Sequence, residues 1–202
     1  EYLYLTTNSP RKRKTSRDRI LAIATMHFAK LGYLGTSLEA VVKDAGVSRG
    51  ALYHHFADKH DLFRLVCLKL QSDNAKKIDS AIASGANPWE GFVNGIHSML
   101  DTAADKGVRR ILFVERVSVL TWDEWSAIDM GTVGGSLRPA MIRAMDEGYM
   151  ERRPVAALWY LIAGSISRVT TIAAESDEID LDDMHDEFEQ LLSKYRIDRD
   201  QD

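Results

Sequence analysis

Gly46 divides a short stretch of the chain into two helical segments that have separate start signals. Thr36, followed three residues later by Glu39, has the pattern of a capping box at the start of the first segment. Ser48 is a preferred cap for the second segment, which we expect to end near Phe56. Two short helices joined through so tight a turn form a helix-turn-helix, whose second helix can lie in the major groove of DNA. This pattern therefore predicts a small helical unit that presents its last helix to a partner.

Helical periodicity extends over the rest of the chain. Apolar residues recur every three or four positions, no stretch alternates as a strand would, and the 202 residues include only 13 glycines and 4 prolines. We predict an all-α protein of about nine helices. The expected helices outside the motif start at Ser16 (to about Lys30), at Asp58 (past Leu70 towards Ser84), at Pro88, near Gly107, near Thr121 (to Gly148, with a kink), at Pro154 (to about Glu175) and at Asp182 (to about 196).

The charge of the chain is divided unevenly between its two ends. The net charge is −4, which by itself argues against binding to nucleic acid. Residues 1–60 nevertheless contain ten Lys or Arg and five Asp or Glu, whereas the remainder contains 16 and 25. A basic head on an acidic body is expected when only the head approaches phosphates. We therefore expect a basic arm over residues 1–15, a helix-turn-helix DNA-binding domain over 16–60 and a helical body over 61–202.

The second helix of the motif has an apolar face and a polar face. On the polar face, Arg49 can donate two hydrogen bonds to guanine O6 and N7. Tyr53 can offer its hydroxyl to a phosphate and its ring to a thymine methyl, and Gly50 permits close approach. Residues at helix N-termini and basic residues next to the motif are placed to contact phosphates. The predicted DNA contacts are Arg17, Thr36, Ser48, Arg49, Gly50, Tyr53, His54 and Lys59.

Other kinds of function find little support in the sequence. His54, His55, His60 and Asp61 lie close together in the chain, but His54 and His55 should point in different directions and a helix break separates them from the second pair. We therefore expect no metal there. No glycine-rich phosphate loop or nucleophile motif is present, so we predict no enzyme, no catalytic residue and no cofactor. Cys67 lies on the apolar side of its helix and is expected to be an inert buried thiol rather than a redox sensor.

One segment of the chain resembles the DNA-binding domain of the TetR family of repressors. The resemblance rests on TSLEAVVKDAGVSRGALYHHF at residues 36–56 and on ADKHDL directly after it. Val42 departs from the pattern, since the family more often has alanine at this helix crossing. The resemblance covers residues 16–65 firmly and the rest more loosely, through RILFV at 110–114 and WDEW at 122–125. It implies a homodimer with N-terminal DNA-binding heads and C-terminal domains that hold a small ligand, whose binding respaces the heads and releases the operator.

The two last helices are the expected site of dimerisation. The helix over about 154–175 is apolar nearly all round, and the one over 182–196 has an apolar stripe. Two such helices from each chain would form a four-helix interface, although both stripes could instead close the monomer core. A two-fold dimer requires a roughly palindromic operator. The uncharged stretch over 154–167 is by its length predicted to be too short to span a bilayer, so we expect no membrane and a cytoplasmic location.

Aromatic residues of the body are the candidates for an effector cavity. Aromatic walls suit flat or apolar ligands, but each of these residues also fits plain core packing. His97 could anchor a ligand or be a core histidine bonded to a backbone carbonyl. Glu115 could attract a cationic ligand, or pair with Arg109 or Arg110, or face water. The predicted ligand-binding residues are Phe92, His97, Phe113, Trp122, Trp125 and Trp159.

These features predict a ligand-responsive DNA-binding transcriptional regulator. The most consistent form is a repressor that a small, largely apolar or aromatic effector releases from a palindromic operator. The alternative is a DNA-binding regulator whose body serves only for assembly and senses no small molecule. A metal-dependent enzyme is a third and weaker alternative.

Overall fold

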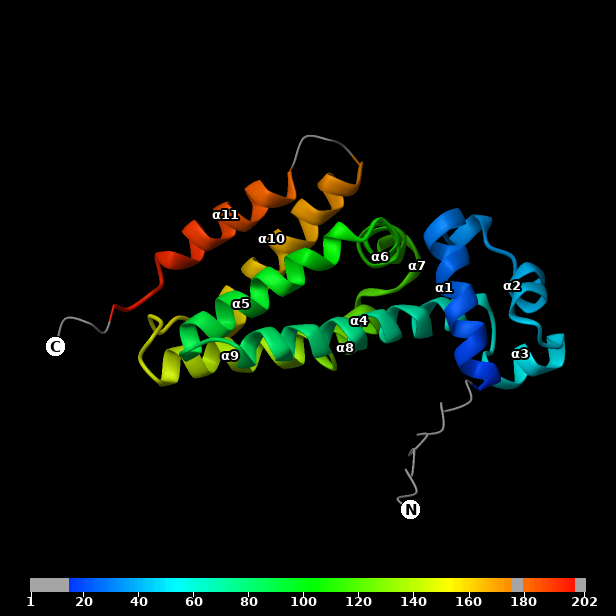
Figure 1. Ribbon diagram of the computed structural model, residues 1–202, viewed down its shortest axis with the longest axis horizontal. Helices are drawn as coiled ribbons and strands as arrows, with labels where there is room; N and C mark the ends of the chain where they lie inside the picture. The colour runs from blue at the N-terminus through cyan, green and yellow to red at the C-terminus, as the bar shows by residue number, and fades with distance from the viewer. Residues whose placement is uncertain (1–14, 176–179, 199–202) are drawn as a thin grey trace, which may run out of the picture.

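The computed structural model describes residues 15–175 and 180–198. These residues form helices, one isolated β-bridge between Met150 and Arg196, and no strand. The predicted all-α class is therefore confirmed. Figure 1 shows a helical head at one end of the molecule, with a long helix, α4 (Lys59–Ala83), extending from it into a larger helical body.

The head consists of α1 (Ser16–Gly35), α2 (Leu38–Ala45) and α3 (Arg49–His55), and α4 (Lys59–Ala83) follows directly. Its core includes Phe28, Val41 and Leu52, none of which is exposed to solvent. The same apolar cluster continues into Ile111 and Leu112 of the body. Residues 16–60 therefore do not close their own core, and a movement of the segment around residue 111 must be felt in the head.

The first helix starts one residue earlier and ends later than predicted. Its N-cap is Thr15 rather than Ser16, because Thr15 and Asp18 form a reciprocal capping box. The helical segment extends beyond Lys30, but it contains a break at Gly32, whose φ is 74°. That backbone conformation favours glycine, so the sequence can turn at this position without strain.

The second helix is capped by Ser37, and the predicted capping box of Thr36 with Glu39 is wrong. The Ser37 hydroxyl accepts a hydrogen bond from the Ala40 N–H at 3.1 Å. Thr36 is only 2% exposed, and its hydroxyl donates to the Gly32 carbonyl oxygen at 2.8 Å. Of two neighbouring hydroxyl residues, the one that faces the core bonds to the preceding turn and the one at the surface caps the helix.

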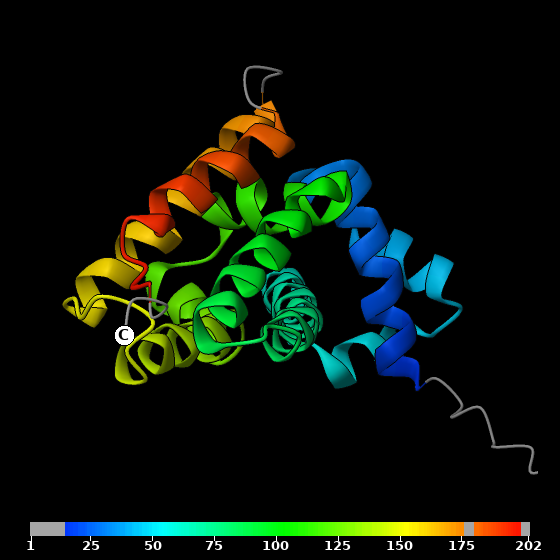
Figure 2. The same ribbon diagram turned by 60° about the vertical axis from the view of Figure 1, so that its left-hand side comes forward.

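The body surrounds a second apolar core. Its centre includes Phe92, Ile96, Leu137 and Trp159, each at most 1% exposed. Figure 2 shows the last two helices along the side of the body that lies away from α1–α3. The body helices are α5 (Pro88–Asp101), a 3₁₀ turn (Thr102–Ala104), α6 (Lys106–Arg109), the π-helical segment η2 (Arg110–Glu115), α7 (Arg116–Val119), α8 (Trp122–Met130), α9 (Val133–Asp146), α10 (Val155–Glu175) and α11 (Leu181–Ser193).

The structure divides the body into more helical segments than the sequence predicted. The predicted helix between Gly107 and Thr121 consists of α6, η2 and α7, and the predicted kink near Gly131 is a full break between α8 and α9. A π-helical turn is less favourable than an α-helical one and occurs mostly at functional sites. The segment η2 is therefore a natural place to look for a conformational switch.

Helix α10 is longer and more apolar than its uncharged stretch indicated. Residues Val155–Ala173 have a mean hydropathy of 1.4, which by length and composition alone is enough to cross a membrane, so the length argument from the sequence does not hold. Trp159, Ile162 and Ile166 nevertheless pack in the core of the body. Tyr160 and Leu161 are 53% and 67% exposed on the other side. The helix is thus a core helix with one uncovered apolar face.

The apolar stripe of α11 closes the monomer core. Met184, Phe188 and Leu192 are buried against the body, as one of the two alternatives from the sequence required. The exposed side of α11 includes the acidic residues Asp182 and Asp186. The outward faces of α10 and α11 therefore differ, the first being apolar and the second largely acidic.

Candidate nucleic-acid interface and cavity

Helix α3 is held in place by a short turn and two buried side chains. Gly46 ends α2 in the left-handed conformation, with φ of 62°. The Ser48 hydroxyl then accepts the Ala51 N–H at 3.1 Å and starts α3. Leu52 and Phe56 are 0% and 1% exposed and attach the helix to the head core. These features confirm the predicted start and the predicted inner face of this helix.

The outward face of α3 consists of the predicted residues. Arg49, Gly50, Tyr53 and His54 are all exposed. The Arg49 guanidinium lies 5.6 Å from the centre of the Tyr53 ring and 3.9 Å from the Glu39 carboxylate. The hydrogen bond with Tyr53, followed by electrostatic attraction to Tyr53 and to Glu39, raises the pKa of Arg49. An exposed pair at this distance is weak, so Arg49 is free to exchange Glu39 for a base edge.

The other predicted DNA contacts are less uniform. The Arg17 guanidinium lies 5.9 Å from the centre of the Phe56 ring, on the exposed side of the head. Lys59 is half-buried, with its Nζ 4.6 Å from the centre of the Tyr33 ring and 3.4 Å from the Leu34 carbonyl oxygen. Burial lowers the pKa of Lys59. The buried Thr36 hydroxyl is not available to a phosphate, and the arm up to residue 14 lies outside the described residues.

The half-buried carboxylate of Glu115 joins the end of α1 to the π-helical segment of the body. The Tyr33 N–H donates to Glu115 Oε2 at 3.1 Å, and Arg110 Nε donates to Glu115 Oε1 at 3.2 Å. Arg110 Nη1 also donates to the Lys30 carbonyl oxygen at 2.9 Å. A side chain at Gly32 would collide with the Glu115 carboxylate. Of the alternatives for Glu115, the structure therefore selects pairing with Arg110.

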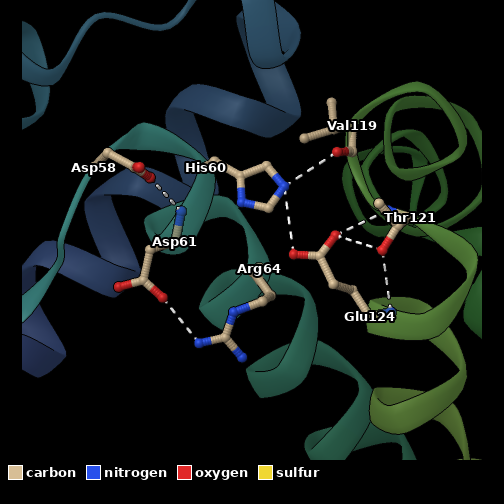
Figure 3. A network of polar contacts seen from close by, with 7 residues as sticks. All are labelled: Asp58, His60, Asp61, Arg64, Val119, Thr121 and Glu124. Atoms are coloured by element: carbon tan, nitrogen blue, oxygen red, sulfur yellow. Dashed lines mark hydrogen bonds and ion pairs between the residues drawn. The ribbon is translucent and has the colours of Figure 1, made fainter.

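A second polar contact joins the start of α4 to the loop between α7 and α8. His60 Nε2 lies 3.2 Å from the Val119 carbonyl oxygen and 3.6 Å from Glu124 Oε1, and Figure 3 shows both contacts. Glu124 also forms a capping box with Thr121 at the start of α8. In the same view Arg64 Nη2 donates to Asp61 Oδ1 at 2.8 Å. The first turn of α4, directly after the helix-turn-helix, is thus attached to the N-terminus of α8.

Neither the histidine cluster nor the cysteine forms a reactive site. Within residues 15–175 and 180–198, no three His, Cys, Asp or Glu side chains are grouped so that they could hold a metal ion. Cys67 is fully buried, and burial raises the pKa of its thiol to about 12. A thiol with that pKa is protonated at neutral pH and is a poor nucleophile.

The body contains a cavity of about 480 Å³ between α4, α5, η2, α7, α8, α9 and α10. Of the predicted ligand-binding residues, Phe113, Trp122, Trp125 and Trp159 lie in its wall. A volume of this size suits a drug-sized molecule. Its wall residues are Gln71, Asn74, Ile78, Met99, Thr102, Phe113, Arg116, Val117, Trp122, Trp125, Ser126, Asp129, Met130, Val133, Trp159, Tyr160, Ala163, Gly164, Ser167, Arg168 and Thr171.

Phe92 and His97 do not line this cavity. Phe92 is completely buried in the body core. His97 faces α11, where its Nδ1 lies 2.6 Å from Nδ1 of His185 and the two rings stack at 4.9 Å. Burial and the charge of His185 lower the pKa of His97. The partner of His97 is therefore neither a ligand nor the backbone carbonyl that the alternative proposed, because the helix turns this residue towards its neighbour helix.

Three charged residues lie among the apolar walls, and Arg116 and Asp129 are less exposed than the third, Arg168. Arg116 donates from Nε to the Leu112 carbonyl oxygen at 2.9 Å and from Nη2 to Ser167 Oγ at 3.1 Å. Its guanidinium lies 4.1 Å from the centre of the Trp125 ring. Burial raises the pKa of Asp129 to about 6, against the opposing effect of Arg116. The only hydrogen bond to its carboxylate from the described residues comes from Gln71 Nε2, at 3.4 Å.

The chain matches known families over both of its parts. Residues 20–66 match the tetR family of bacterial regulatory proteins, and residues 89–195 match the tetracyclin repressor-like C-terminal domain. The second match alone covers more than half of the chain. The protein belongs to the TetR family.

Individual relatives agree with this assignment. The chain is 28% identical to the transcriptional repressor AcnR of Corynebacterium glutamicum, over 81% of this chain and 86% of AcnR. It is 22% identical to the Tn10 TetC protein of Escherichia coli, over 91% and 90%. A solved TetR-family regulator from Pectobacterium atrosepticum superimposes with a TM-score of 0.76 at 25% identity, covering 91% of this chain and 95% of that one. Bacillus subtilis FadR in complex with stearoyl-CoA has the same fold, with a TM-score of 0.74, 18% identity and coverage of 86% and 96%.

Membership of the TetR family establishes the general function. The protein is a DNA-binding transcriptional regulator, as predicted, and not an enzyme. Regulators of this family bind operator DNA, act as dimers and are soluble proteins. The effector, the residues that contact DNA and the dimer interface of this particular TetR-family member have to be argued from its own geometry.

The sequence interpretation missed the polar part of the cavity. Arg116 and Asp129 were not singled out, because charged residues on a helix usually face water. One signal was present in α4, where Gln71 and Asn74 interrupt a stripe of apolar residues at helical spacing. Both are buried, at 4% and 6% exposure, and Asn74 Nδ2 donates to Gln71 Oε1 at 3.4 Å. Buried amides on an otherwise apolar helix face indicate a polar cavity wall.

Proposed function

We propose that this TetR-family protein is a cytoplasmic repressor that binds a roughly palindromic operator as a homodimer and leaves it when a small effector fills the cavity. Arg49 and Tyr53 of each copy contact base edges and backbone in the major groove, with Gly50 allowing close approach. Arg17, Ser48, His54 and Lys59 contact the neighbouring phosphates. Thr36 is left out of this set because its side chain is buried.

The single observation that supports effector control is the position of the cavity beside the two head contacts. Phe113 lies in the wall of the cavity, two residues before Glu115, which bonds to the end of α1. Trp122 and Trp125 lie in the wall on either side of Glu124, which is bonded to the start of α4 through His60. A ligand that displaces η2 therefore pulls on the end of α1, and one that displaces α8 pulls on the start of α4.

The fold of a solved neighbour is consistent with this role. FadR of Bacillus subtilis, which has the same fold, was solved in complex with stearoyl-CoA. A protein of this fold can therefore bind a ligand that carries a long acyl chain. We infer an apolar or aromatic effector body for this chain from its own walls, which include three tryptophans, Phe113 and two methionines.

We infer that the dimer interface is centred on α10, with a smaller part for α11. Leu161 is exposed there, as are Tyr160 and Gly164, which also border the cavity, and nothing lies within 4 Å of a Cβ at Gly164, so a partner helix can approach. The outward face of α11 is acidic, and Leu191, 47% exposed, is its one large apolar contribution among the described residues. Both helices of the original expectation are retained, but the apolar contact lies mainly on α10.

The test of effector control has two steps. Operator sequences are first selected from random DNA with the purified protein, and the compounds that raise its melting temperature are identified. Each stabilising compound is then added to the protein–operator complex. We expect at least one to weaken operator binding by tenfold or more, which corresponds to about 1.4 kcal/mol of coupling free energy. A set of stabilising compounds that leaves operator affinity unchanged would favour the alternative, a regulator that senses no small molecule.

A further inference from the structure

The cavity wall contains an anion, Asp129, and a half-buried cation, Arg116, that do not meet, with a second and exposed cation, Arg168, at its edge. Arg116 and Asp129 both lie in its wall, and each influences the pKa of the other. No ion pair within 4.0 Å joins them, although both belong to the part of the chain that the structure describes. Separated charges in an apolar enclosure are costly unless another group satisfies them. The arrangement therefore leaves room for a guest between the two.

Each of the two groups keeps unused hydrogen-bonding capacity. A guanidinium has five N–H donors, and within the described residues Arg116 uses only Nε and Nη2. Stacking on Trp125 fixes the plane of the guanidinium, so Nη1 is held rather than mobile. An ionised carboxylate accepts about four hydrogen bonds, and Asp129 receives a single long one from Gln71. The cavity thus offers a fixed donor and an acceptor.

A cationic guest fits this pair poorly. An ammonium group would be attracted by Asp129 and by the tryptophan faces. It would also lie close to Arg116, which cannot release its proton, and to Arg168 at the exposed edge of the wall. In a water-poor cavity this repulsion is only weakly screened.

An anionic guest fits Arg116 but conflicts with Asp129. Two carboxylates that share one donor cannot both stay ionised at short distance, so one of them must take up a proton. Asp129 is the group able to do so, because its pKa is already raised to about 6. Near neutral pH this proton uptake reduces the affinity for a carboxylate, and the loss disappears in acid.

A neutral group with a donor next to an acceptor satisfies both residues at once. A carboxamide carbonyl accepts from Arg116, and its N–H donates to the Asp129 carboxylate. Neither residue has to change its protonation state. Building on the proposed effector role of this cavity, we propose that the effector has a neutral donor–acceptor head, of the carboxamide, lactam or urea class, that bridges Arg116 and Asp129. Its apolar body lies against Trp122, Trp125 and Trp159.

The experiment compares three heads on two bodies. Naphthalene is used with a carboxamide, a carboxylate or a methylammonium head, and a decyl chain with a carboxamide, a carboxylate or an ammonium head. Each of these six compounds is titrated by calorimetry into the full chain. At about pH 7.5 we expect the carboxamide on each body to bind at least about tenfold more tightly than the ammonium on the same body, and more tightly than the carboxylate. Between about pH 7.5 and 5.5 the carboxylate should gain roughly tenfold in affinity, whereas the carboxamide should gain none, because protonation of Asp129 weakens the acceptor for its N–H.

Two isosteric variants separate the role of Asp129 from a general charge effect. Asp129→Asn should raise carboxylate affinity about tenfold near pH 7.5 and remove its pH dependence. The matched control is Asp123→Asn, which removes the same charge from an exposed position on the same helix outside the wall and should change nothing. The pH series on the unaltered protein tests the same point even if Asp129→Asn fails to fold.

Operator binding measured with the same compounds separates the assignment of the effector head from the proposal of effector control. Tightest binding of an ammonium, or a carboxylate that binds as well as the carboxamide without any pH dependence, would overturn the head assignment. If such a compound still releases the operator, effector control stands. If the carboxamides bind as expected but never affect the operator, the head assignment stands and effector control falls. Failure of all six compounds to bind would overturn the head assignment.

Discussion

At the scale of single residues, Arg49 determines how sequence-specific this regulator is. Its guanidinium is exposed and only weakly held by Glu39, so it can make a bidentate contact with guanine. Arg49→Ala should lower affinity for the selected operator by roughly five- to one-hundred-fold and relax the preference at one base pair per half-site. Binding to random DNA should fall much less. Equal losses on both kinds of DNA, measured by fluorescence anisotropy, would show that Arg49 contacts only the backbone.

Lys59 should behave differently from Arg49. It packs on Tyr33 with its Nζ near the end of α1, and burial lowers its pKa. Lys59→Gln should weaken binding to all sequences alike and reduce the slope of log K against log salt by about one unit per head. The measurement is a salt titration on operator and on random DNA. An unchanged slope would mean that Lys59 only supports the turn beneath it.

Asp129 makes stability depend on pH. Its pKa is raised from 3.8 to about 6 by burial, so the folded protein binds this proton more tightly than the unfolded chain. The favourable contribution is fully present below about pH 4 and is lost as the pH rises through about 6. Asp129→Asn should therefore stabilise the protein by about 1–3 kcal/mol near pH 8 and have little effect near pH 4. Urea unfolding at the two pH values tests this, with Asp123→Asn as the control that should show no pH-dependent difference.

At the scale of elements, the contact between η2 and the end of α1 is the most constrained point of the fold. Gly32 has a positive φ, and a side chain there would also collide with Glu115. Gly148 has a similar φ of 76°, but a side chain there would meet nothing within 4 Å. Gly32→Ala should therefore destabilise the protein more than Gly148→Ala, by a further amount of about 1–3 kcal/mol.

The outcome for this pair of variants is measured by thermal or urea unfolding. Equal losses would mean that only backbone strain matters and that Glu115 yields without cost. If the collision matters, Gly32→Ala should also change the response of operator binding to effector, since it displaces the carboxylate that bonds Tyr33. The control Gly148→Ala lies between α9 and α10 and should leave that response intact.

The same scale shows why some elements could be predicted and others could not. The start and faces of α3 follow from local rules, because Gly46 and Ser48 act within a few residues of their own position. The cap of α2 could not be predicted in this way, because Thr36 and Ser37 are equally suitable as N-caps by local sequence. Only packing against the core determines that Thr36 is the buried one. Phe113 and Phe92 are both aromatic and both helical, yet only Phe113 meets the cavity. Such choices depend on how helices far apart in the sequence pack together.

At the scale of the whole molecule, the uncovered face of α10 is the feature that a monomer leaves unexplained. Of the apolar window within Val155–Ala173, only 28% is buried inside the chain. A dimer would cover Tyr160 and Leu161, and it would set the distance between two α3 helices to match successive major grooves. The polar contacts through Glu115 and His60 would then convert a change in the cavity into a change in that distance.

Leu161→Asp tests this arrangement. A charge in the centre of an apolar interface should dissociate the dimer at micromolar concentration, because the carboxylate would lose its water without gaining a partner. The mass measured by light scattering should fall to 22.7 kDa, the mass of one chain. Affinity for the palindromic operator should fall much more than affinity for a single half-site, because only the dimer engages both halves.

The matched control is Met26→Asp, which places the same charge on a side chain that is 65% exposed on α1. This variant should remain a dimer, because α1 lies in the head and away from α10. A Leu161→Asp protein that stays dimeric would move the interface away from this face of α10. The next candidate would then be α11, where Leu191→Asp is the corresponding change, and in that case the acidic outward face of α11 would need basic residues of the partner copy opposite it.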